Sequence, residues 1–113
     1  MVGGMLELVE ESAALNPKIL SKSRLLILSV LDELEGEGAT FRELKAALRI
    51  NEGVLFTNIG VLEEMGYVGE SKVKVEKKMT SYNITKEGRD ELRKVDEWLK
   101  KMIEGRSHER KPK

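Results

Sequence analysis

Several residue types that build chemical sites are absent or scarce in this 113-residue chain. It contains no cysteine, which excludes a disulfide framework, a thiolate zinc site and a cysteine nucleophile. Its one histidine, His108, lies near the C-terminus, so a metal site built from several histidines is also excluded. No apolar run approaches the roughly 20 residues that a membrane-spanning helix needs. The N-terminal segment carries acids rather than the bases of a signal peptide. We therefore expect a soluble, cytoplasmic protein that uses no cofactor and enters no membrane.

The chain also lacks an excess of either charge, because 20 basic and 20 acidic residues give a net charge of zero. The charges are unevenly distributed, with +3 over residues 16–31, −3 over 52–66 and +2 over 67–85. A net charge of zero argues against tight non-specific binding to nucleic acid, whereas the basic segments are compatible with a localised contact. Charged residues make up 35% of the chain and glutamine is absent. Such a composition is typical of thermophile proteins.

Hydrophobic periodicity predicts two helices in the first third of the chain. Residues 5–15 form a short amphipathic helix, which the pair Asn16-Pro17 ends. The same Asn-Pro pair is a signal for a cap and a helix start, and Ser21 or Ser23 offers a second cap for the next helix, which is mostly buried. Two glycines terminate that helix.

Two shorter helices follow, joined by a tight turn. Thr40 and Glu43 form a capping box that starts the first of them. Asn51 can cap the second, which spans 52–65, and Gly66 can end it in a left-handed conformation. Two short helices joined by a three-residue turn are typical of a helix-turn-helix.

Alternating apolar residues then predict a β-hairpin with a charged tip at 76–78. On its return strand, 80–85, Tyr82 and Ile84 share one face and Ser81 lies on the other. We therefore predict a mainly α fold with a small β-hairpin (α+β), a winged helix-turn-helix with N- and C-terminal helical extensions. Its segments are an N-terminal helix at 1–15, a winged-helix DNA-binding domain at 16–85, a dimerisation helix at 86–104 and a disordered basic tail at 105–113.

The sequence resembles winged-helix transcriptional regulators of the MarR and ArsR type from about residue 16 to residue 92. Four stretches carry the resemblance: 23–28, 40–44, 62–68 and 78–89. The resemblance implies a homodimer that binds double-stranded DNA. It also implies that the helix at 52–65 enters the major groove, that the hairpin (the wing) contacts phosphates or the minor groove, and that the terminal helices form the dimer.

Basic residues on the predicted wing are the best sign of nucleic-acid binding. They are Lys72, Lys74, Lys77 and Lys78. Lysines on a protruding hairpin can neutralise phosphates and release counterions, although they can also serve only to keep an edge strand from pairing. Arg24, within a second basic cluster, and Arg42, at the start of the helix at 41–48, are further candidates for backbone contact.

The helix at 52–65 has no lysine or arginine, which is unusual for a helix that reads DNA bases. Its candidate DNA contacts are Asn51, Gly53, Thr57 and Asn58. One alternative is weak base reading by its polar groups and apolar side chains, and another is close approach at the glycines with affinity supplied by the wing. A third is that Phe56, Gly60 and Val61 bind a protein partner instead.

The last helix carries an apolar stripe with the spacing of a coiled-coil seam. We predict that it forms a homodimer together with the N-terminal helix. The candidate dimer residues are Leu6, Val9, Leu92, Val95, Trp98, Leu99 and Met102. The alternative is that this stripe packs on its own domain.

These observations favour a homodimeric DNA-binding transcriptional regulator, and the alternative is a winged-helix module for protein–protein contact. No catalytic nucleophile and base can be paired in the sequence, and no phosphate-binding loop is present. We therefore predict neither enzymatic activity nor a metal site.

Overall fold

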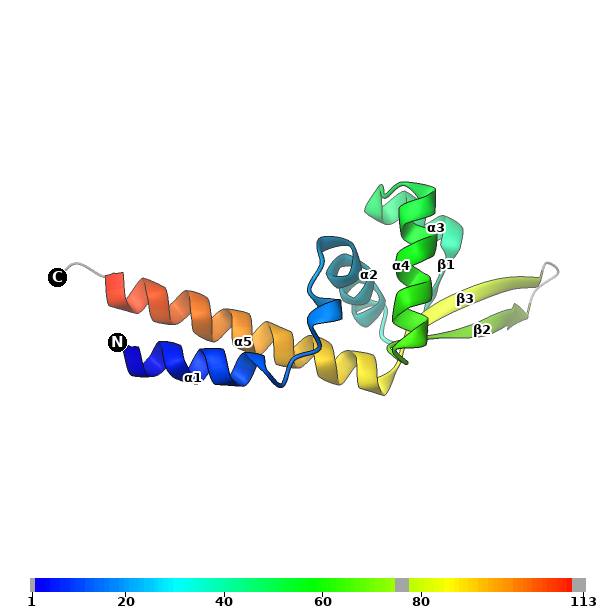
Figure 1. The fold of residues 1–113 in the computed structure, drawn as a ribbon. Helices are drawn as coiled ribbons and strands as arrows, with labels where there is room; N and C mark the ends of the chain where they lie inside the picture. Colours follow the sequence, from blue (N-terminus) through cyan, green and yellow to red (C-terminus); the bar gives the residue numbers. More distant parts are fainter. Residues whose placement is uncertain (1, 75–77, 111–113) are drawn as a thin grey trace.

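A computed structural model describes the backbone of residues 2–74 and 78–110 and the side chains of 4–71 and 79–104. The elements in chain order are α1 (Val2–Ser12), the 3-10 helix η1 (Pro17–Ile19), α2 (Lys22–Glu33), β1 (Ala39–Thr40), α3 (Phe41–Leu48), α4 (Glu52–Glu64), β2 (Val68–Lys74), β3 (Lys78–Ile84) and α5 (Lys86–Arg110). Figure 1 shows α2, α3, α4 and the sheet grouped as one domain, from which the β2–β3 wing projects. The predicted α+β winged-helix fold is confirmed.

Helices α1 and α5 lie side by side and extend away from the winged domain, as Figure 1 shows. We call α1 and the part of α5 beside it the arm. The indole Nε1 of Trp98 donates a hydrogen bond to the carbonyl oxygen of Leu8 at 2.8 Å. Lys101 Nζ lies 3.3 Å from Glu11 Oε2. The arm makes the molecule elongated, with principal extents of 62 × 25 × 24 Å.

The predicted caps form. Ser21 Oγ accepts a hydrogen bond from Arg24 N at 3.1 Å and starts α2. Thr40 and Glu43 make the reciprocal pair of a capping box at α3, with distances of 3.2 and 2.9 Å. Asn51 Oδ1 accepts from the first amides of α4. These short polar side chains satisfy amides that a helix leaves without an internal acceptor, so they fix where each helix begins.

Two backbone positions in the helix-turn-helix are left-handed. Gly66, just after α4, has φ 80°, as predicted for a residue that ends a helix. Arg49, in the turn between α3 and α4, has φ 55°. A left-handed non-glycine residue is uncommon and allows this turn to be tight.

The sheet has three strands rather than the two predicted, in the order β1-β3-β2, all antiparallel. The short strand β1 pairs Thr40 with Ser81, and Ser81 is buried instead of lying on a polar face. Gly38 has φ 77°, and a Cβ there would lie 2.6 Å from Ser81 Oγ and Tyr82 O. Glycine is therefore needed for the chain to approach β3 closely.

The core lies where α2, α3, α4 and α5 meet the sheet. Its fully buried large side chains are Ile19, Ile27, Leu28, Leu31, Leu44, Leu55, Leu62 and Val95. Burying them supplies most of the stability, at roughly 1.5–3 kcal/mol for each aliphatic side chain. Within the part of the chain that the structure describes, no helix is long and apolar enough to cross a membrane.

The helical segments differ from prediction at both ends of the chain. The first helix begins at Val2 and ends at Ser12, with turns before Asn16. The last helix continues to Arg110, so a disordered tail starting at 105 was wrong for residues 105–110. Gly105 alone does not break a helix that continues into good helix formers, because one internal glycine costs only about 1 kcal/mol.

Candidate nucleic-acid interface

Helix α4 has one face in the core and the opposite face uncovered by its own chain. Leu55, Ile59 and Leu62 are buried, as the sequence predicted. On the other side Phe56 is 72% exposed, and Thr57 beside it is exposed. The exposed face carries no cation, because α4 contains no lysine or arginine.

Two residues predicted to contact DNA, Arg24 and Asn58, also contact each other. Arg24 Nε donates to Asn58 Oδ1 at 2.8 Å, and Arg24 Nη1 donates to the carbonyl oxygen of Lys18 at 2.6 Å. Asn58 Nδ2 donates to the carbonyl oxygen of Val54 at 2.8 Å. Each polar group of the Asn58 amide therefore makes one hydrogen bond within the chain, which leaves one N–H and one oxygen lone pair for another contact. The contact of Asn58 with DNA stays a prediction.

The start of α4 is organised by Asn51 and Gly53. Asn51 Oδ1 accepts from Gly53 N at 2.8 Å and from Val54 N at 3.2 Å. A Cβ on Gly53 would lie 3.3 Å from the same Oδ1 atom, so glycine leaves room for the cap. Both residues are exposed. By contrast, a Cβ on Gly60 would meet nothing within 4 Å in the described part of the chain, so packing does not require glycine there.

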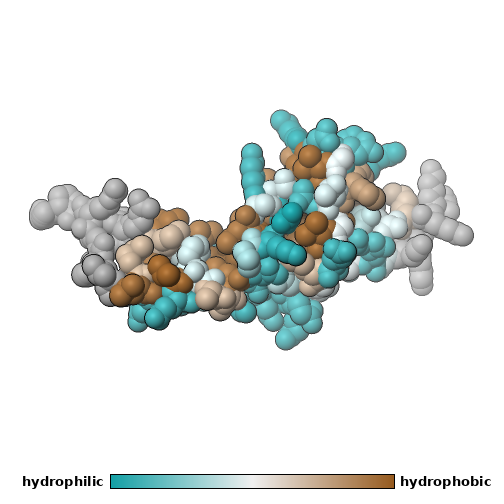
Figure 2. Space-filling model, viewed as in Figure 1, coloured by the Kyte–Doolittle hydropathy of each residue, from teal (hydrophilic) through white to brown (hydrophobic). Residues whose placement is uncertain are grey.

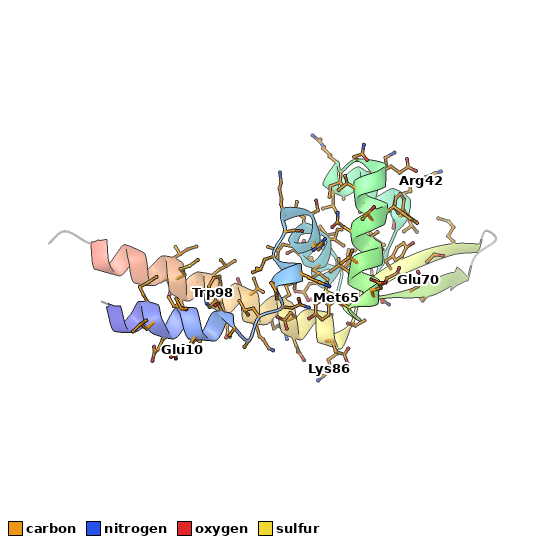
Figure 3. All side chains as sticks on the ribbon, in the orientation of Figure 1. Glu10, Arg42, Met65, Glu70, Lys86 and Trp98 are labelled. Carbon is orange, nitrogen blue, oxygen red and sulfur yellow. The ribbon has the colours of Figure 1, made fainter. Side chains whose placement is uncertain are left out.

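Helix α3 brings exposed cations beside α4, and sequence reasoning named only one of them. Arg42 is exposed, and Figure 3 shows it on the side of the domain from which the wing projects. Lys45 and Arg49 are also exposed. Lys45 Nζ lies 3.2 Å from Glu52 Oε1, so the acid at the start of α4 has a cation beside it. The signal that points to Arg49 is its place in the turn of the helix-turn-helix.

The wing projects from the domain as predicted (Figure 1). The strand register places Lys74 opposite Lys78 and Lys72 opposite Thr80. The predicted phosphate contacts of the wing lysines depend on side chains that the structure does not describe. For Lys72, Lys74 and Lys78 only the backbone is described, and Lys77 lies outside the described residues.

Two carboxyl groups meet where α4 joins the wing, a feature that the sequence did not indicate. Burial raises the pKa of Glu63 to about 7. A hydrogen bond to Glu70 and the negative charge of Glu70 contribute further to this rise in pKa. Burial also raises the pKa of Tyr82, followed by the charges of Glu70 and Glu63. Tyr82 faces Glu70 across the β2–β3 ladder, and Figure 3 shows Glu70 beside the end of α4. Two carboxyl groups in hydrogen-bond contact favour sharing one proton.

The predicted dimer residues divide into three groups: exposed, buried and half-buried. Leu6 and Val9 on α1 are 59% and 61% exposed, and Figure 2 shows hydrophobic surface along the arm. Val95 is 1% exposed and belongs to the core of its own chain. Val95 therefore packs within its own chain, which is the alternative that the sequence left open for this stripe, and its place in a dimer stays a prediction.

The remaining residues of the stripe are half-buried. They are Leu92, Trp98, Leu99 and Met102. Figure 3 shows Trp98 between α1 and α5, where it packs within its own chain. Ile103, just beyond them on α5, is 62% exposed.

The helix-turn-helix, the uncovered face of α4 and the projecting wing together define a winged-helix domain, and the model of the winged helix DNA-binding domain family matches residues 23–103. The chain belongs to this family. The resemblance to winged-helix transcriptional regulators is confirmed. In the part of the chain that the structure describes, no three metal-binding side chains of histidine, cysteine, aspartate or glutamate gather in one place.

Solved structures with the same fold include transcriptional regulators. A transcriptional regulator homologue from Pyrococcus horikoshii is 29% identical, with a TM-score of 0.75, covering 88% of this chain and 96% of that one. The transcriptional regulator BldR from Sulfolobus solfataricus is 21% identical, with a TM-score of 0.66, covering 89% and 69%. YusO from Bacillus subtilis is 14% identical, with a TM-score of 0.73, covering 98% and 74%. A comparison with curated protein sequences found no match.

Proposed function

We propose that this chain is a transcriptional regulator that binds double-stranded DNA as a homodimer. In this proposal α4 enters the major groove and the wing contacts the phosphate backbone. The arm joins two copies through its exposed apolar residues, Leu6, Val9 and Ile103 among them. A symmetric dimer of helix-turn-helix units reads two half-sites separated by about one helical turn of DNA or a multiple of it.

The observation that carries the proposal is the uncovered outer face of α4, which has exposed cations beside it. Arg42 of α3 and Arg49, in the turn before α4, are both exposed. The wing, which follows α4 in the chain, has four lysines in its sequence. A B-form major groove is about 12 Å wide and admits a single helix, while the flanking strands carry the phosphates. A helix without lysine or arginine, next to exposed arginines and followed by a lysine-rich wing, fits this geometry.

Base reading on this helix rests on small and apolar groups rather than on cations. The hydroxyl of Thr57 can donate to or accept from a base edge, and Phe56 can pack on a thymine methyl group. Gly60 has open space where a side chain would stand, which lets a groove wall approach α4 closely. We therefore propose that base contacts give modest specificity and that phosphate contacts supply most of the affinity.

Selection from random duplex DNA at near-physiological salt tests this proposal, with the molecular mass of the complex measured in solution. We expect an enriched palindrome bound by a dimer. Lys77→Glu with Lys78→Glu should weaken binding and flatten its salt dependence by roughly one unit of slope for each lost phosphate contact. The matched control is Lys86→Glu with Lys100→Glu, which reverses the charge of two exposed lysines of α5 outside the proposed DNA interface. A folded dimer that enriches no sequence would contradict the proposal.

The exposure of Phe56 favours one second candidate function, a protein-docking role for α4. A side chain of this size left 72% exposed on an uncharged face is a typical anchor for a partner protein. In that case Phe56, Gly60 and Val61 form the docking face, and charge reversal in the wing leaves the complex unchanged. Phe56→Ala distinguishes the two, because it should abolish docking but only reduce DNA binding.

A further inference from the structure

Asn16, between α1 and η1, makes hydrogen bonds to three different parts of the molecule. Its Oδ1 accepts from Lys18 N at 3.0 Å and caps η1. Its backbone N donates to Glu91 Oε2 on α5 at 2.8 Å. Its Nδ2 donates to Tyr67 Oη at 3.1 Å and lies 3.3 Å from Met65 Sδ. One residue therefore touches η1, α5 and the end of α4.

The contact on α5 is a buried one. Glu91 is 8% exposed, and its other oxygen lies 3.6 Å from Lys94 Nζ. A buried carboxylate costs several kcal/mol unless hydrogen bonds and a counter-charge satisfy it. The amide of Asn16 is one of these partners, so the start of the domain is held against α5 at a fixed place.

The contacts made by Asn16 Nδ2 lie at the C-terminal end of α4. The end that faces DNA in the proposed function is the other one, where α4 begins. Met65 is the C-cap of α4, and Tyr67 directly precedes β2. Figure 3 shows Met65 where α4 meets the segment that follows α1. The same amide group therefore contacts the end of α4 and the beginning of the wing.

A separate contact joins the start of α5 to the turn between α4 and β2. Thr85 Oγ1 donates to the carbonyl oxygen of Gly66 at 2.6 Å. A Cβ on Gly88 would collide with the carbonyl oxygen of Tyr67, so α5 packs closely against this turn. Glu91 lies six residues beyond Thr85, which is about 9 Å along a helix. With the contact at Thr85 alone, α5 could rotate relative to α4. The second contact, at Glu91, lies far enough from the first to resist this rotation.

Capping η1 does not explain the whole arrangement. A serine hydroxyl could accept from Lys18 N equally well, because serine and asparagine are comparable caps. Only a side chain with a further donor at the length of Nδ2 reaches Tyr67 and Met65. Capping η1 requires the acceptor Oδ1 of Asn16 but not its donor Nδ2.

We propose that Asn16 is a positioning residue that fixes the angle between the arm and α4. In a dimer held together by its arms, this angle sets the distance between the two α4 helices and so the separation of half-sites that the protein accepts. The first statement depends only on the fold, and the second rests on the proposed function.

The first part is tested without DNA by a distance measurement within one chain. The chain has no cysteine, so Thr57→Cys on α4 and Lys100→Cys on α5 place two spin labels at unique, exposed sites. Labelled protein is diluted with excess unlabelled protein, so that each distance is recorded within one chain. Asn16→Ser keeps the cap and the backbone N–H but loses the donor, and Tyr67→Phe removes only its acceptor.

We expect both variants to broaden or shift the distance distribution in the same way. Tyr82→Phe removes a hydroxyl that makes no contact with Asn16, so it should leave the distance distribution unchanged. Ile27→Val lowers stability through the core and controls for loosening of the whole fold, so it should also leave the distribution unchanged. A distribution for Asn16→Ser that matches the wild type would overturn the proposal, as would equal broadening in Ile27→Val.

The second part is tested on duplexes whose two selected half-sites are moved apart or together by one base pair. We expect the wild type to discriminate strongly between spacings and Asn16→Ser to discriminate less, by about two- to tenfold, the factor for one lost hydrogen bond. Binding to a single half-site should not change. An unaltered spacing profile together with an altered label distance would overturn the link to half-sites alone. Failure of the wild type to bind any duplex would instead refute the proposed function and leave the distance result standing.

Discussion

Arg24 Nε donates to Asn58 Oδ1 at 2.8 Å and joins the start of α2 to the middle of α4. Both residues are half-buried, and the same guanidinium also donates to the carbonyl oxygen of Lys18. Asn58 therefore helps to hold α4 in place, while the neighbouring residue Thr57 remains exposed. Two adjacent positions on α4 thus have separable roles, one in stability and one at the surface.

Replacing Asn58 by alanine should lower stability without changing the preferred DNA sequence. The change leaves the half-buried Arg24 Nε without its acceptor, which costs about 1.5–3 kcal/mol for a hydrogen bond to a charged group. Denaturant unfolding measures this loss. Thr57→Ala is the matched control, because it should change stability by less than about 0.5 kcal/mol and yet alter base selection. A changed motif in Asn58→Ala would show that this amide reads bases after all.

Replacing Glu52 by glutamine should strengthen DNA binding. The acid stands at the start of α4, where it would repel a nearby phosphate, and it lies 3.2 Å from Lys45. Its removal frees that lysine, so the salt dependence of binding should steepen by about one unit of slope if Lys45 then contacts a phosphate. The folded state should lose only about 0.5–1 kcal/mol, from an exposed ion pair and a favourable helix-dipole interaction.

Titrating the affinity of Glu52→Gln against salt concentration checks this prediction. Glu97→Gln, which removes one exposed acid from the arm, controls for the change in net charge. Equal effects of the two substitutions would mean that only the overall charge matters. Unchanged affinity in both would place the start of α4 away from the DNA.

The sequence was sufficient to predict the elements that depend on local signals. The capping box at Thr40 and Glu43, the cap at Asn51 and the left-handed Gly66 each lie within a few residues of the groups they serve. Their geometry is therefore encoded locally. The order of these elements also gave the winged helix-turn-helix.

The features that the sequence did not reveal depend on contacts between distant segments. Strand β1 has only two residues, too few for periodicity to show, and it exists because it pairs with β3. The stripe on α5 is apolar, but periodicity does not say what covers it, and Val95 belongs to the core of its own chain. Likewise, the polar groups of Arg24 and Asn58 were visible in the sequence, whereas their mutual hydrogen bond depends on the packing of α2 on α4.

Replacing Val9 by lysine should dissociate the proposed dimer while leaving each chain folded. Val9 is 61% exposed, so a lysine there costs the single chain little. Within an interface it would bury a charge and lose apolar contact, which should weaken the dimer by at least about 2 kcal/mol, or more than tenfold. Sedimentation equilibrium measures the dissociation constant. Leu8→Lys is the contrasting variant, because Leu8 is buried against α5 and its replacement should detach α1.

Circular dichroism and thermal melting distinguish these two variants. Val9→Lys should keep the helix content and melting temperature of the monomer, and Leu8→Lys should lower both. An intact dimer of Val9→Lys would move the interface away from this face of the arm.

Stability should fall as the pH rises from about 4.5 to about 7, because of Glu63. The pKa of Glu63 is raised from 4.5 to about 7 in the folded chain, chiefly by burial and then by Glu70. Between these values the folded chain keeps a proton that the unfolded chain has lost, so raising the pH favours unfolding. The loss is complete above the folded pKa.

Glu63→Gln should remove this pH dependence, because glutamine stays neutral and still donates a hydrogen bond to Glu70. We expect the variant to match the wild type near pH 4.5 and to be more stable near pH 8, by about 1 kcal/mol after allowing for screening of a partly exposed group. Denaturant unfolding across this range measures the difference. Glu64→Gln, one residue further along α4 and exposed, is the matched control and should leave the slope intact. Parallel pH profiles for wild type and Glu63→Gln would show that the two carboxyl groups do not interact in solution, and the close contact between the end of α4 and β2 would then have to be held by apolar packing alone.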